Sequence, residues 1–454
     1  MELLIKNAVI ASSQSVEKGN LLIQDERIAA VGNVNAADDV PILDAEGLYL
    51  LPGGVDVHTH FDLDVGFDRA SDDWYTGTVA AACGGTTAVV DHMAFGPKGC
   101  RLGYQAEVYH KLAKDAVIDY GFHGVIQHVD SQVLEDMASL MEMGIPSFKV
   151  YLTYNYGLSD ADLLRVLQKS KELGAVICAH CENDGIIQVL REELLTAGKT
   201  APRYHPISRP AACEAEAVWR MLMLAKTAGE ANVYVVHLST ALGLEAIRTA
   251  KRQGQANIGV ESCPQYLWLD EALYADDREG LKYIMSPPLR GKADRAALWE
   301  GLSQGEIDVI GTDHCPFFFE TQKQRGRDNF SLAPGGAPGV ETRMQLLFSA
   351  FLEGRISLTR VVESCCTKPA AIFGLASRKG DIKVGGDADL VLFDPSTSGE
   401  IRHELLHERV DYTPYEGIPV RGRPVMTFSR GRLVAENGQF VGEKGGGKFL
   451  HRQF

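Results

Sequence analysis

Eight short apolar segments, each followed by a stretch of helical character, occupy the middle of the chain and restrict what it can fold into. They lie near residues 55–58, 86–92, 119–127, 147–152, 175–180, 232–238, 257–263 and 307–312. Runs this short and this apolar are typical of buried parallel strands, and their alternation with amphipathic stretches indicates βα units. Eight such units predict a TIM barrel, an α/β fold that collects catalytic groups at the C-terminal ends of its strands.

One of the helical stretches shows how regular this alternation is. Ser159 is a suitable N-cap, Asp162 stands at the third helical position, and Gly174 is a suitable stop signal. The next apolar run begins at once with Ala175. The sequence therefore predicts a helix between Ser159 and Gly174 that leads directly into a strand.

Both ends of the chain have a different pattern from the middle. The N-terminal segment alternates in short runs, with a plausible hairpin turn at Asp25–Arg27, and the text after Gly374 is again rich in strand-forming residues. Neither segment alone buries enough surface to be stable. We therefore expect residues 1–52 and 376–454 to form one small β-sandwich domain beside a catalytic barrel at 53–375.

Composition excludes several classes of function. The chain has 454 residues, a net charge of -15, 45% hydrophobic and 23% charged residues, which argues against nucleic-acid or anionic-membrane partners. No apolar run approaches the ~20 residues of a membrane span, and no signal-peptide pattern is present. Its nine cysteines lie mostly in apolar runs and are expected to be reduced. These features predict a cytoplasmic enzyme that acts on a small molecule.

Polar residues end several of the apolar runs. Because the ends of parallel barrel strands converge on one face, these side chains should gather in one place. A lone His-x-His pair fits either a metal site or two hydrogen-bonded histidines near a turn, but further histidines at equivalent strand ends favour metal. The expected ligands of a two-metal site are His58, His60, Lys149, His180, His237 and Asp313.

Lys149 differs from the other five members of this set because an ammonium has no lone pair to offer a cation. Reaction of the neutral amine with carbon dioxide gives an anionic carbamate whose two oxygens can bridge two metals, and burial would favour that reaction. Taken alone, the residue is more typical of a lysine that extends from the barrel rim to solvent or pairs with an acid there.

Several stretches together resemble one known family. They are LPGGVDVHTHFD, SFKVYLTYNY, AHCEND, VVHLS, ESCPQYL, SPPLR, IGTDHCPF and APGGAPGVETR. The chain resembles the cyclic amidohydrolases of the dihydropyrimidinase and D-hydantoinase type over nearly its whole length. The stretch HMAFGPKGCRL is most similar to the phenylhydantoinase branch.

The resemblance implies a role for each expected metal ligand. His58, His60 and Asp313 would hold one ion, His180 and His237 the other, and Lys149, as N6-carboxylysine, would bridge both. The ions would be zinc, although the same donors also accept manganese or cobalt. Carbon dioxide is needed for the carboxylation, and a homotetramer is expected, with Phe449 and Phe454 of a disordered or neighbour-docked tail as interface residues.

The resemblance also implies substrate contacts. Tyr154 would stabilise the oxyanion, Ser286 would contact the amide ring through its backbone, and Gly335 stands where the family usually has an asparagine. Asp62 replaces the arginine that dihydroorotases use for the substrate carboxylate, which argues against that activity.

We therefore expect hydrolysis of 5-monosubstituted hydantoins, aryl-substituted and of D configuration, to N-carbamoyl amino acids by a hydroxide shared between two ions. Asp313 would act first as general base and then as general acid. Dihydropyrimidinase and allantoinase activity are alternatives within the family, and a non-catalytic scaffold protein is an alternative of another class. The apolar residues expected to line the substrate pocket are Phe61, Leu63, Val65, Phe67, Met93, Phe95 and Tyr156.

Overall fold

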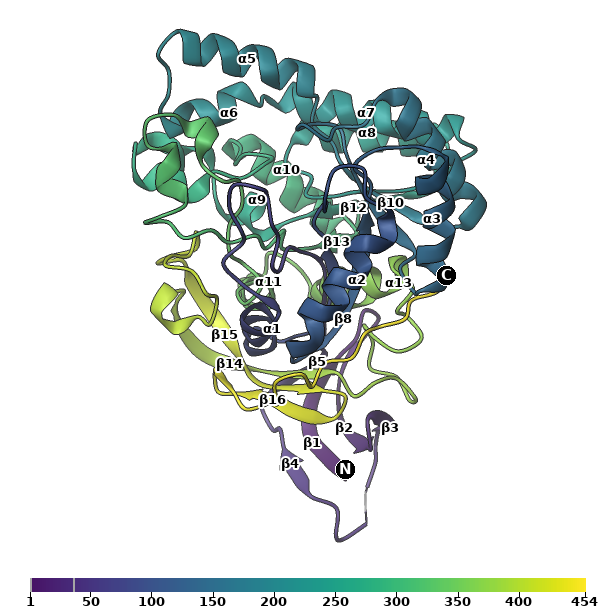
Figure 1. Ribbon diagram of the computed structural model, residues 1–454. Coiled ribbons are helices and arrows are strands. Elements are labelled where there is room, and N and C mark those ends of the chain that lie inside the picture. The colour runs from purple at the N-terminus through teal and green to yellow at the C-terminus, as the bar shows by residue number, and fades with distance from the viewer. Residues whose placement is uncertain (1, 36) are drawn as a thin grey trace.

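Two β-sheets organise the protein, an eight-stranded parallel sheet surrounded by helices and a nine-stranded mixed sheet beneath it (Figure 1). The computed structural model describes residues 2–35 and 37–454. Residues 1 and 36, which belong to the expected N-terminal segment, lie outside the described residues.

The parallel sheet is the predicted barrel. Its strands follow one another in chain order, and each of the eight predicted runs contains one of them. They are β6 (Gly54–Thr59), β7 (Thr86–His92), β8 (Asp119–Val125), β9 (Ser147–Tyr151), β10 (Val176–His180), β11 (Asn232–Val235), β12 (Ile258–Ser262) and β13 (Val309–Ile310). A parallel bridge between Thr59 and His314 joins the first strand to the segment after the last, which closes the barrel near its C-terminal end.

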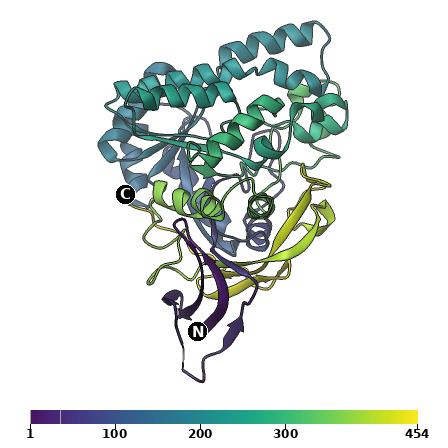
Figure 2. The same ribbon diagram turned by 180° about the vertical axis from the view of Figure 1, so that it is seen from behind.

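Helices cover the outside of the barrel (Figures 1 and 2). They are α1 (Trp74–Cys83), α2 (Leu102–Leu112), α3 (Ser131–Glu142), α4 (Asp160–Leu173), α5 (Asp184–Thr196), α6 (His205–Ser208), α7 (Ala211–Thr227), α8 (Ala241–Arg252), α9 (Pro264–Trp268), α10 (Lys292–Ser303), α11 (Arg343–Leu352), α12 (Leu358–Val362) and α13 (Lys368–Ile372). The α4 prediction is confirmed: the Ser159 hydroxyl accepts the Asp162 N–H at 3.2 Å, and Gly174 ends the helix at φ 72°.

The mixed sheet unites the two ends of the chain. Its strands are β1 (Glu2–Ala11), β2 (Val16–Gln24), β3 (Arg27–Gly32), β4 (Ile42–Asp44), β5 (Tyr49–Pro52), β14 (Leu390–Glu400), β15 (Pro419–Ser429), β16 (Arg432–Glu436) and β17 (Gln439–Phe440). The antiparallel pair of β5 and β14 joins the N-terminal part to the C-terminal part in one continuous sheet. The turn predicted at Asp25 links β2 to β3, and a separate apolar cluster around Ile5 and Leu390 packs this region. The predicted fold class is confirmed.

A buried ionic cluster connects the base of the barrel to the mixed sheet. The Lys379 ammonium lies 2.7 Å from Asp119 at the start of β8, 3.0 Å from Asp387 and 2.6 Å from Asp389. Arg430, in the turn after β15, binds Asp119 at 3.0 Å. Buried charges are stable only when they are paired, so this cluster fixes the two sheets relative to each other.

The C-terminal tail packs on its own barrel, so the expectation of a disordered tail was wrong. The Phe449 ring lies 5.4 Å from that of Phe122 on β8, and Leu450 joins an apolar cluster inside the base of the barrel. The fully buried Arg452 donates to the backbone carbonyl of Phe122. Figures 1 and 2 place the C-terminus beside the barrel, away from the N-terminus in the mixed sheet. Phe449 therefore makes these contacts within its own chain.

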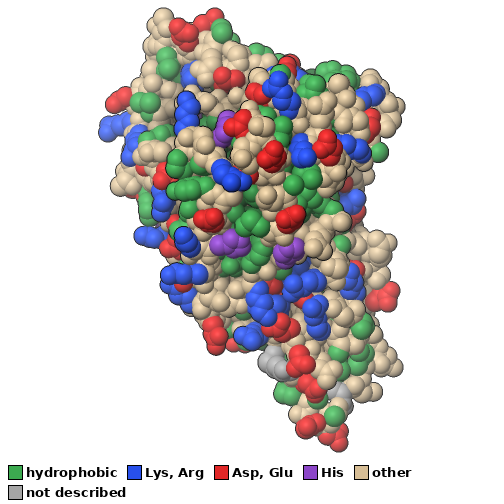
Figure 3. Space-filling view, turned by 45° about the vertical axis from the view of Figure 1, so that its right-hand side comes forward, with side chains coloured by type: hydrophobic (Ala, Val, Ile, Leu, Met, Phe, Trp, Pro, Cys, Tyr) green, Lys and Arg blue, Asp and Glu red, His purple; other side chains and the backbone are tan. Residues whose placement is uncertain are grey.

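Charged side chains of both signs are interspersed over the face seen in Figure 3. Within residues 2–35 and 37–454, no helix is both long and apolar enough to cross a bilayer.

Candidate metal centre and catalytic cleft

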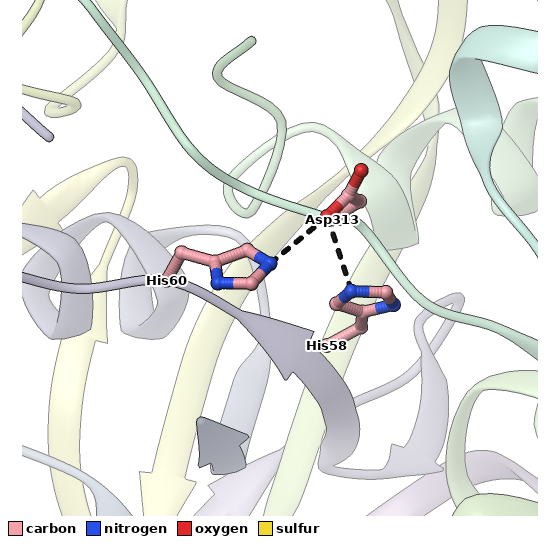
Figure 4. Close-up of side chains that lie close together, drawn as sticks. All are labelled: His58, His60 and Asp313. Atoms are coloured by element: carbon pink, nitrogen blue, oxygen red, sulfur yellow. Dashed lines mark hydrogen bonds and ion pairs between the residues drawn. The ribbon is translucent and has the colours of Figure 1, made fainter. Parts of the chain in front are cut away.

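Three of the predicted ligands converge at the C-terminal mouth of the barrel. The Nε2 atoms of His58 and His60 each lie 3.1 Å from the same Asp313 carboxylate oxygen (Figure 4). The two histidines end β6, and Asp313 follows β13, which the barrel closure places next to β6. Donor atoms about 2.0–2.2 Å from a zinc ion stand roughly this far from one another, so this trio has the spacing of a metal site.

The other two predicted histidines form a second group at the same mouth. His180 ends β10 and His237 follows β11, and His180 Nδ1 lies 2.9 Å from His237 Nε2. The His237 ring is stacked 5.5 Å from that of His58, which brings the second group against the first. All five side chains therefore face one small volume, as the sequence predicted.

Several residues at the barrel mouth have a strained backbone conformation. Asp313 has φ 53°, His237 has φ 40° and Tyr154 has φ 69°, in a region that residues other than glycine seldom adopt. Such conformations cost about 1–3 kcal/mol each and persist where the surrounding structure imposes them. Their presence at three site residues fits a preorganised active site better than an ordinary set of barrel loops.

Glu261, at the end of β12, orients two of the histidines, and sequence reasoning missed it. One carboxylate oxygen lies 2.6 Å from His58 Nδ1 and also accepts the His237 backbone N–H at 2.9 Å. The other accepts the Tyr234 hydroxyl at 2.9 Å. The contact to Nδ1 directs His58 Nε2 toward Asp313, in the carboxylate–histidine arrangement that fixes metal ligands. The position of Glu261 at a strand end was the sequence signal that could have revealed this role.

Glu182 orients His180 in the way that Glu261 orients His58. Its carboxylate lies 2.8 Å from His180 Nε2, which leaves Nδ1 to face His237. The Arg209 guanidinium binds the same carboxylate and lies over the Tyr154 ring, 5.4 Å from its centroid. The stretch AHCEND contained this glutamate two positions after the histidine, but an acid so close in sequence was not distinguishable from a loop residue.

The electrostatics of the mouth favour neutral imidazoles. Burial lowers the pKa of His60 to about 4, and it also lowers the pKa values of His180 and His237. Burial likewise opposes protonation of His58, but the carboxylates of Glu261 and Asp313 outweigh it and raise the pKa of His58 to about 9. His58 thus lies in a pocket that attracts positive charge, while the other three imidazoles are free to donate lone pairs.

Lys149 lies among these groups with its ammonium nitrogen 3.4 Å from His58 Nε2. The side chain is 1% exposed, and burial lowers its pKa. No carboxylate lies within salt-bridge distance of it in the described part of the chain. The alternative of a rim lysine that reaches solvent is therefore wrong, and the residue occupies a place where an anion between the two groups would complete both.

The donor set fits two divalent cations. Neutral imidazoles and a carboxylate are ordinary ligands of zinc. The His58 ring nitrogen that does not face Asp313 is held by the buried Glu261. The His180 ring nitrogen that does not face His237 is held by the buried Glu182. Without Lys149, the described residues of the mouth offer few protein donors for each of two ions.

The three predicted substrate residues line the same cleft as the expected metal ligands. Tyr154 packs 5.4 Å from the His180 ring, and its backbone N–H donates to Asp184 at 3.2 Å. Burial raises the pKa of Tyr154, so its phenol remains a hydrogen-bond donor. An ideal Cβ on Gly335 would lie 3.8 Å from the Ser286 hydroxyl, which places these two residues next to each other.

A cleft of about 490 Å³ opens over this set, a size suited to a small ligand. His60, Lys149, His180, His237 and Asp313 line it together with Tyr154, Ser286 and Gly335. Of the expected apolar residues, Leu63, Val65, Phe67 and Tyr156 line it, and Phe317 joins them.

The other expected apolar residues have different places. Phe61 is fully buried with its ring 5.4 Å from Trp74, and Met93 belongs to the core. Phe95 stacks behind Tyr156, with ring centroids 3.8 Å apart. For these three residues the expectation of a pocket wall was wrong, because each packs against other side chains of the core or the loops instead of lining the cleft.

Comparison with known proteins agrees with this architecture. The sequence model of the Amidohydrolase family matches residues 49–434. A D-phenylhydantoinase of Escherichia coli O1:K1 is 49% identical over 100% of this chain and 98% of its own length.

Solved structures give the same result. A dihydropyrimidinase from Brevibacillus agri superposes with a TM-score of 0.97 at 42% identity, covering 100% of this chain and 99% of the other. An L-hydantoinase (dihydropyrimidinase) from Arthrobacter aurescens gives a TM-score of 0.89 at 31% identity, covering 98% and 99%. The chain therefore belongs to the amidohydrolase family and is a cyclic-amide hydrolase of the hydantoinase and dihydropyrimidinase type.

Proposed function

We propose that the protein hydrolyses 5-monosubstituted hydantoins, with a preference for aryl substituents and the D configuration, to N-carbamoyl amino acids. The observation that carries the proposal is the cleft itself, in which the histidine and aspartate set faces a wall that includes Leu63, Phe67 and Phe317. A flat apolar substituent would be desolvated against that wall. The 49% identity to a D-phenylhydantoinase supports the same substrate class.

The cofactors in this proposal are two divalent ions, zinc in first place. His58, His60 and Asp313 would hold one ion, His180 and His237 the other, and Lys149 would bridge them as a carbamate. When bound, such a pair supplies a water of lowered pKa and polarises the substrate carbonyl. Manganese and cobalt accept the same ligands.

The protein's own groups then move the protons and bind the ring. Asp313 accepts a proton from the attacking water and delivers it to the ring nitrogen as the amide C–N bond breaks. The Tyr154 hydroxyl donates a hydrogen bond to the carbonyl oxygen while negative charge develops on it. The products are a carboxylate and a ureido group on one open chain, and the second proton of the water leaves to solvent, so atoms and charge balance.

Main-chain groups of Ser286 and Gly335 would bind the ring amide. A Cβ on Gly335 would meet only the Ser286 hydroxyl, at an ordinary contact distance of 3.8 Å, so the position would accept a side chain but does not need one. Gly336 is required for a different reason: it has φ 147°, and a Cβ there would lie 2.3 Å from the Cys315 carbonyl oxygen. The Gly-Gly pair therefore keeps the loop conformation that the contact needs.

Side-by-side kinetics with D- and L-5-phenylhydantoin, dihydrouracil and allantoin test the substrate. We expect the highest kcat/KM for D-5-phenylhydantoin. In Leu63→Ala, its advantage over dihydrouracil should fall by about tenfold or more, since even one methylene group in an apolar pocket is worth about 1–3 kcal/mol. Leu242→Ala, on an exposed part of α8, is the control. A preference for allantoin or dihydrouracil would overturn the proposed substrate.

The carbamate is tested without an activity assay. Protein loaded with metal in the presence of ¹³C-bicarbonate should give one carbamate carbon signal by NMR, which Lys149→Met should lack. An unchanged signal in that variant would contradict carboxylation at this residue.

We also propose the homotetramer that the resemblance implies. Phe454 is 55% exposed and is available for a contact between subunits. Sedimentation of the purified enzyme decides this point, and a monomer would contradict it.

A further inference from the structure

A second group of metal-binding side chains lies outside the catalytic cleft. Cys83 is the last residue of α1, Glu341 precedes α11, and His407 lies between β14 and β15. One potential ligand atom from each falls within 4.8 Å of the other two. None of the three lines the catalytic cleft.

The geometry of this cluster is fixed by its neighbours. His407 is held twice by Glu341, with its backbone N–H 2.6 Å from one carboxylate oxygen and its Nδ1 2.9 Å from the other. A Cβ on Gly84 would lie 2.3 Å from the Glu341 carbonyl oxygen, so the end of α1 lies directly against residue 341. Little rearrangement is needed to bring the three side chains onto one ion, which favours binding.

An ion pair between His407 and Glu341 accounts for two members of the cluster, whereas Cys83 packs at the edge of the apolar core with its thiol close to that pair. Across the described residues, the Cys83 thiol has no hydrogen-bond partner, although it lies beside a buried carboxylate. Burial and the Glu341 carboxylate both raise the pKa of this thiol. A cation placed between the three groups would displace the thiol proton and use all three as ligands.

The cluster is accessible from one side. Cys83 is 5% exposed and Glu341 8%, whereas the His407 side chain is 25% exposed. An ion can thus enter past the imidazole and keep a water molecule at its remaining position. Thiolate, imidazole and carboxylate together are the ligands of zinc and of the softer cadmium, whereas magnesium and calcium prefer oxygen alone.

We propose that Cys83, Glu341 and His407 bind one zinc-like divalent cation, separate from the catalytic pair. As the sulfur–metal bond forms, the Cys83 proton passes to solvent, and no electrons are transferred. The ion would tie the end of α1 and the start of α11 to the loop between β14 and β15. It therefore contributes to stability and takes no part in ring opening, so the proposal is independent of the proposed function.

Cadmium titration of the enzyme with its catalytic ions already loaded tests this site. Metal analysis after gel filtration should find one further ion per chain, together with the ultraviolet absorption of a thiolate–cadmium bond. Cys83→Ser should lose both, and His407→Gln, changed at the most exposed ligand, should bind the ion at least tenfold more weakly. Cys100→Ser, at a half-buried cysteine outside the cluster, should behave like the unaltered enzyme.

Hydantoin hydrolysis measured on the same samples separates the two proposals. Loss of the extra ion with unchanged turnover in Cys83→Ser and His407→Gln supports a site of its own. Absence of an additional ion in the unaltered enzyme would overturn the proposal, as would an unchanged thiolate band in Cys83→Ser. Circular dichroism of each variant confirms that it is folded.

Discussion

Lys149 at the mouth of the barrel and Lys379 at its base are almost equally buried, with 1% and 2% of their surface exposed. Burial disfavours the charged form of both. At the base, three aspartates outweigh burial and raise the pKa of Lys379, so its ammonium persists. At the mouth, Lys149 faces histidines, and burial prevails and lowers its pKa. Burial alone thus does not decide whether a lysine is structural or reactive, because the partners around it do.

The largest expected effect is the loss of activity in Lys149→Ala. Without an anionic bridge the two metal groups lack a shared ligand, and turnover should fall on the order of a thousandfold, as expected when several kcal/mol of metal-dependent stabilisation is lost. Lys171→Ala on the exposed side of α4 is the control. Steady-state kinetics and metal analysis provide the measurement. A Lys149→Ala enzyme with both ions and full activity would refute the bridging role.

Lys379→Met should lose folding stability but keep the catalytic metals, the reverse of Lys149→Ala. Removal of the ammonium leaves Asp119, Asp387 and Asp389 buried without their shared partner, which should cost about 3–5 kcal/mol of unfolding free energy. Denaturant unfolding measures this loss, and the catalytic metal content of the folded fraction should not change. A variant as stable as the parent would mean that the base cluster contributes nothing to the fold.

Glu261→Gln tests whether a buried carboxylate at the barrel mouth orients His58 for metal binding. A neutral amide cannot hold His58 Nδ1–H as strongly as the carboxylate now 2.6 Å away, so metal affinity should fall by about 10–100-fold. Competition with a chelator gives the affinity, and excess zinc should restore part of the activity. Equal affinity in the two enzymes would show that Glu261 does not orient the ligand.

The smallest expected effect is on how folding stability depends on pH in the metal-free, carbonate-free protein, where Lys149 and Lys379 should contribute in opposite ways. Because the folded pKa of Lys149 is lowered, the folded state binds fewer protons than the unfolded one, and stability rises with pH toward about 10.4. Lys149→Met should therefore raise Tm by a few degrees at pH 6 and by less at pH 9.

Lys379 provides the control for this measurement. Its folded pKa is raised, so its contribution is complete below about pH 10.4 and is lost only above it. The Tm deficit of Lys379→Met should be constant between pH 6 and 9. A gain in Lys149→Met that grows with pH would contradict the lowered pKa of Lys149.

Sequence pattern alone determined much of this protein. Period and length of the apolar runs placed the barrel strands, and because parallel strand ends converge, the six strand-end residues could be assigned to one site. The caps of α4 and the turn at Asp25 are local signals that tertiary packing did not override.

Only the tertiary structure decided which groups support that site. Glu261 contacts His58 across 203 positions of sequence, and the cluster of Cys83, Glu341 and His407 draws on three distant segments. The tail carried a disorder-like composition, yet Phe449 packs on Phe122 of β8 and Arg452 is fully buried with a hydrogen bond to the same residue. Periodicity reports which face of an element is buried, whereas a contact between distant segments depends on how the closed barrel brings them together, and no local pattern encodes that distance.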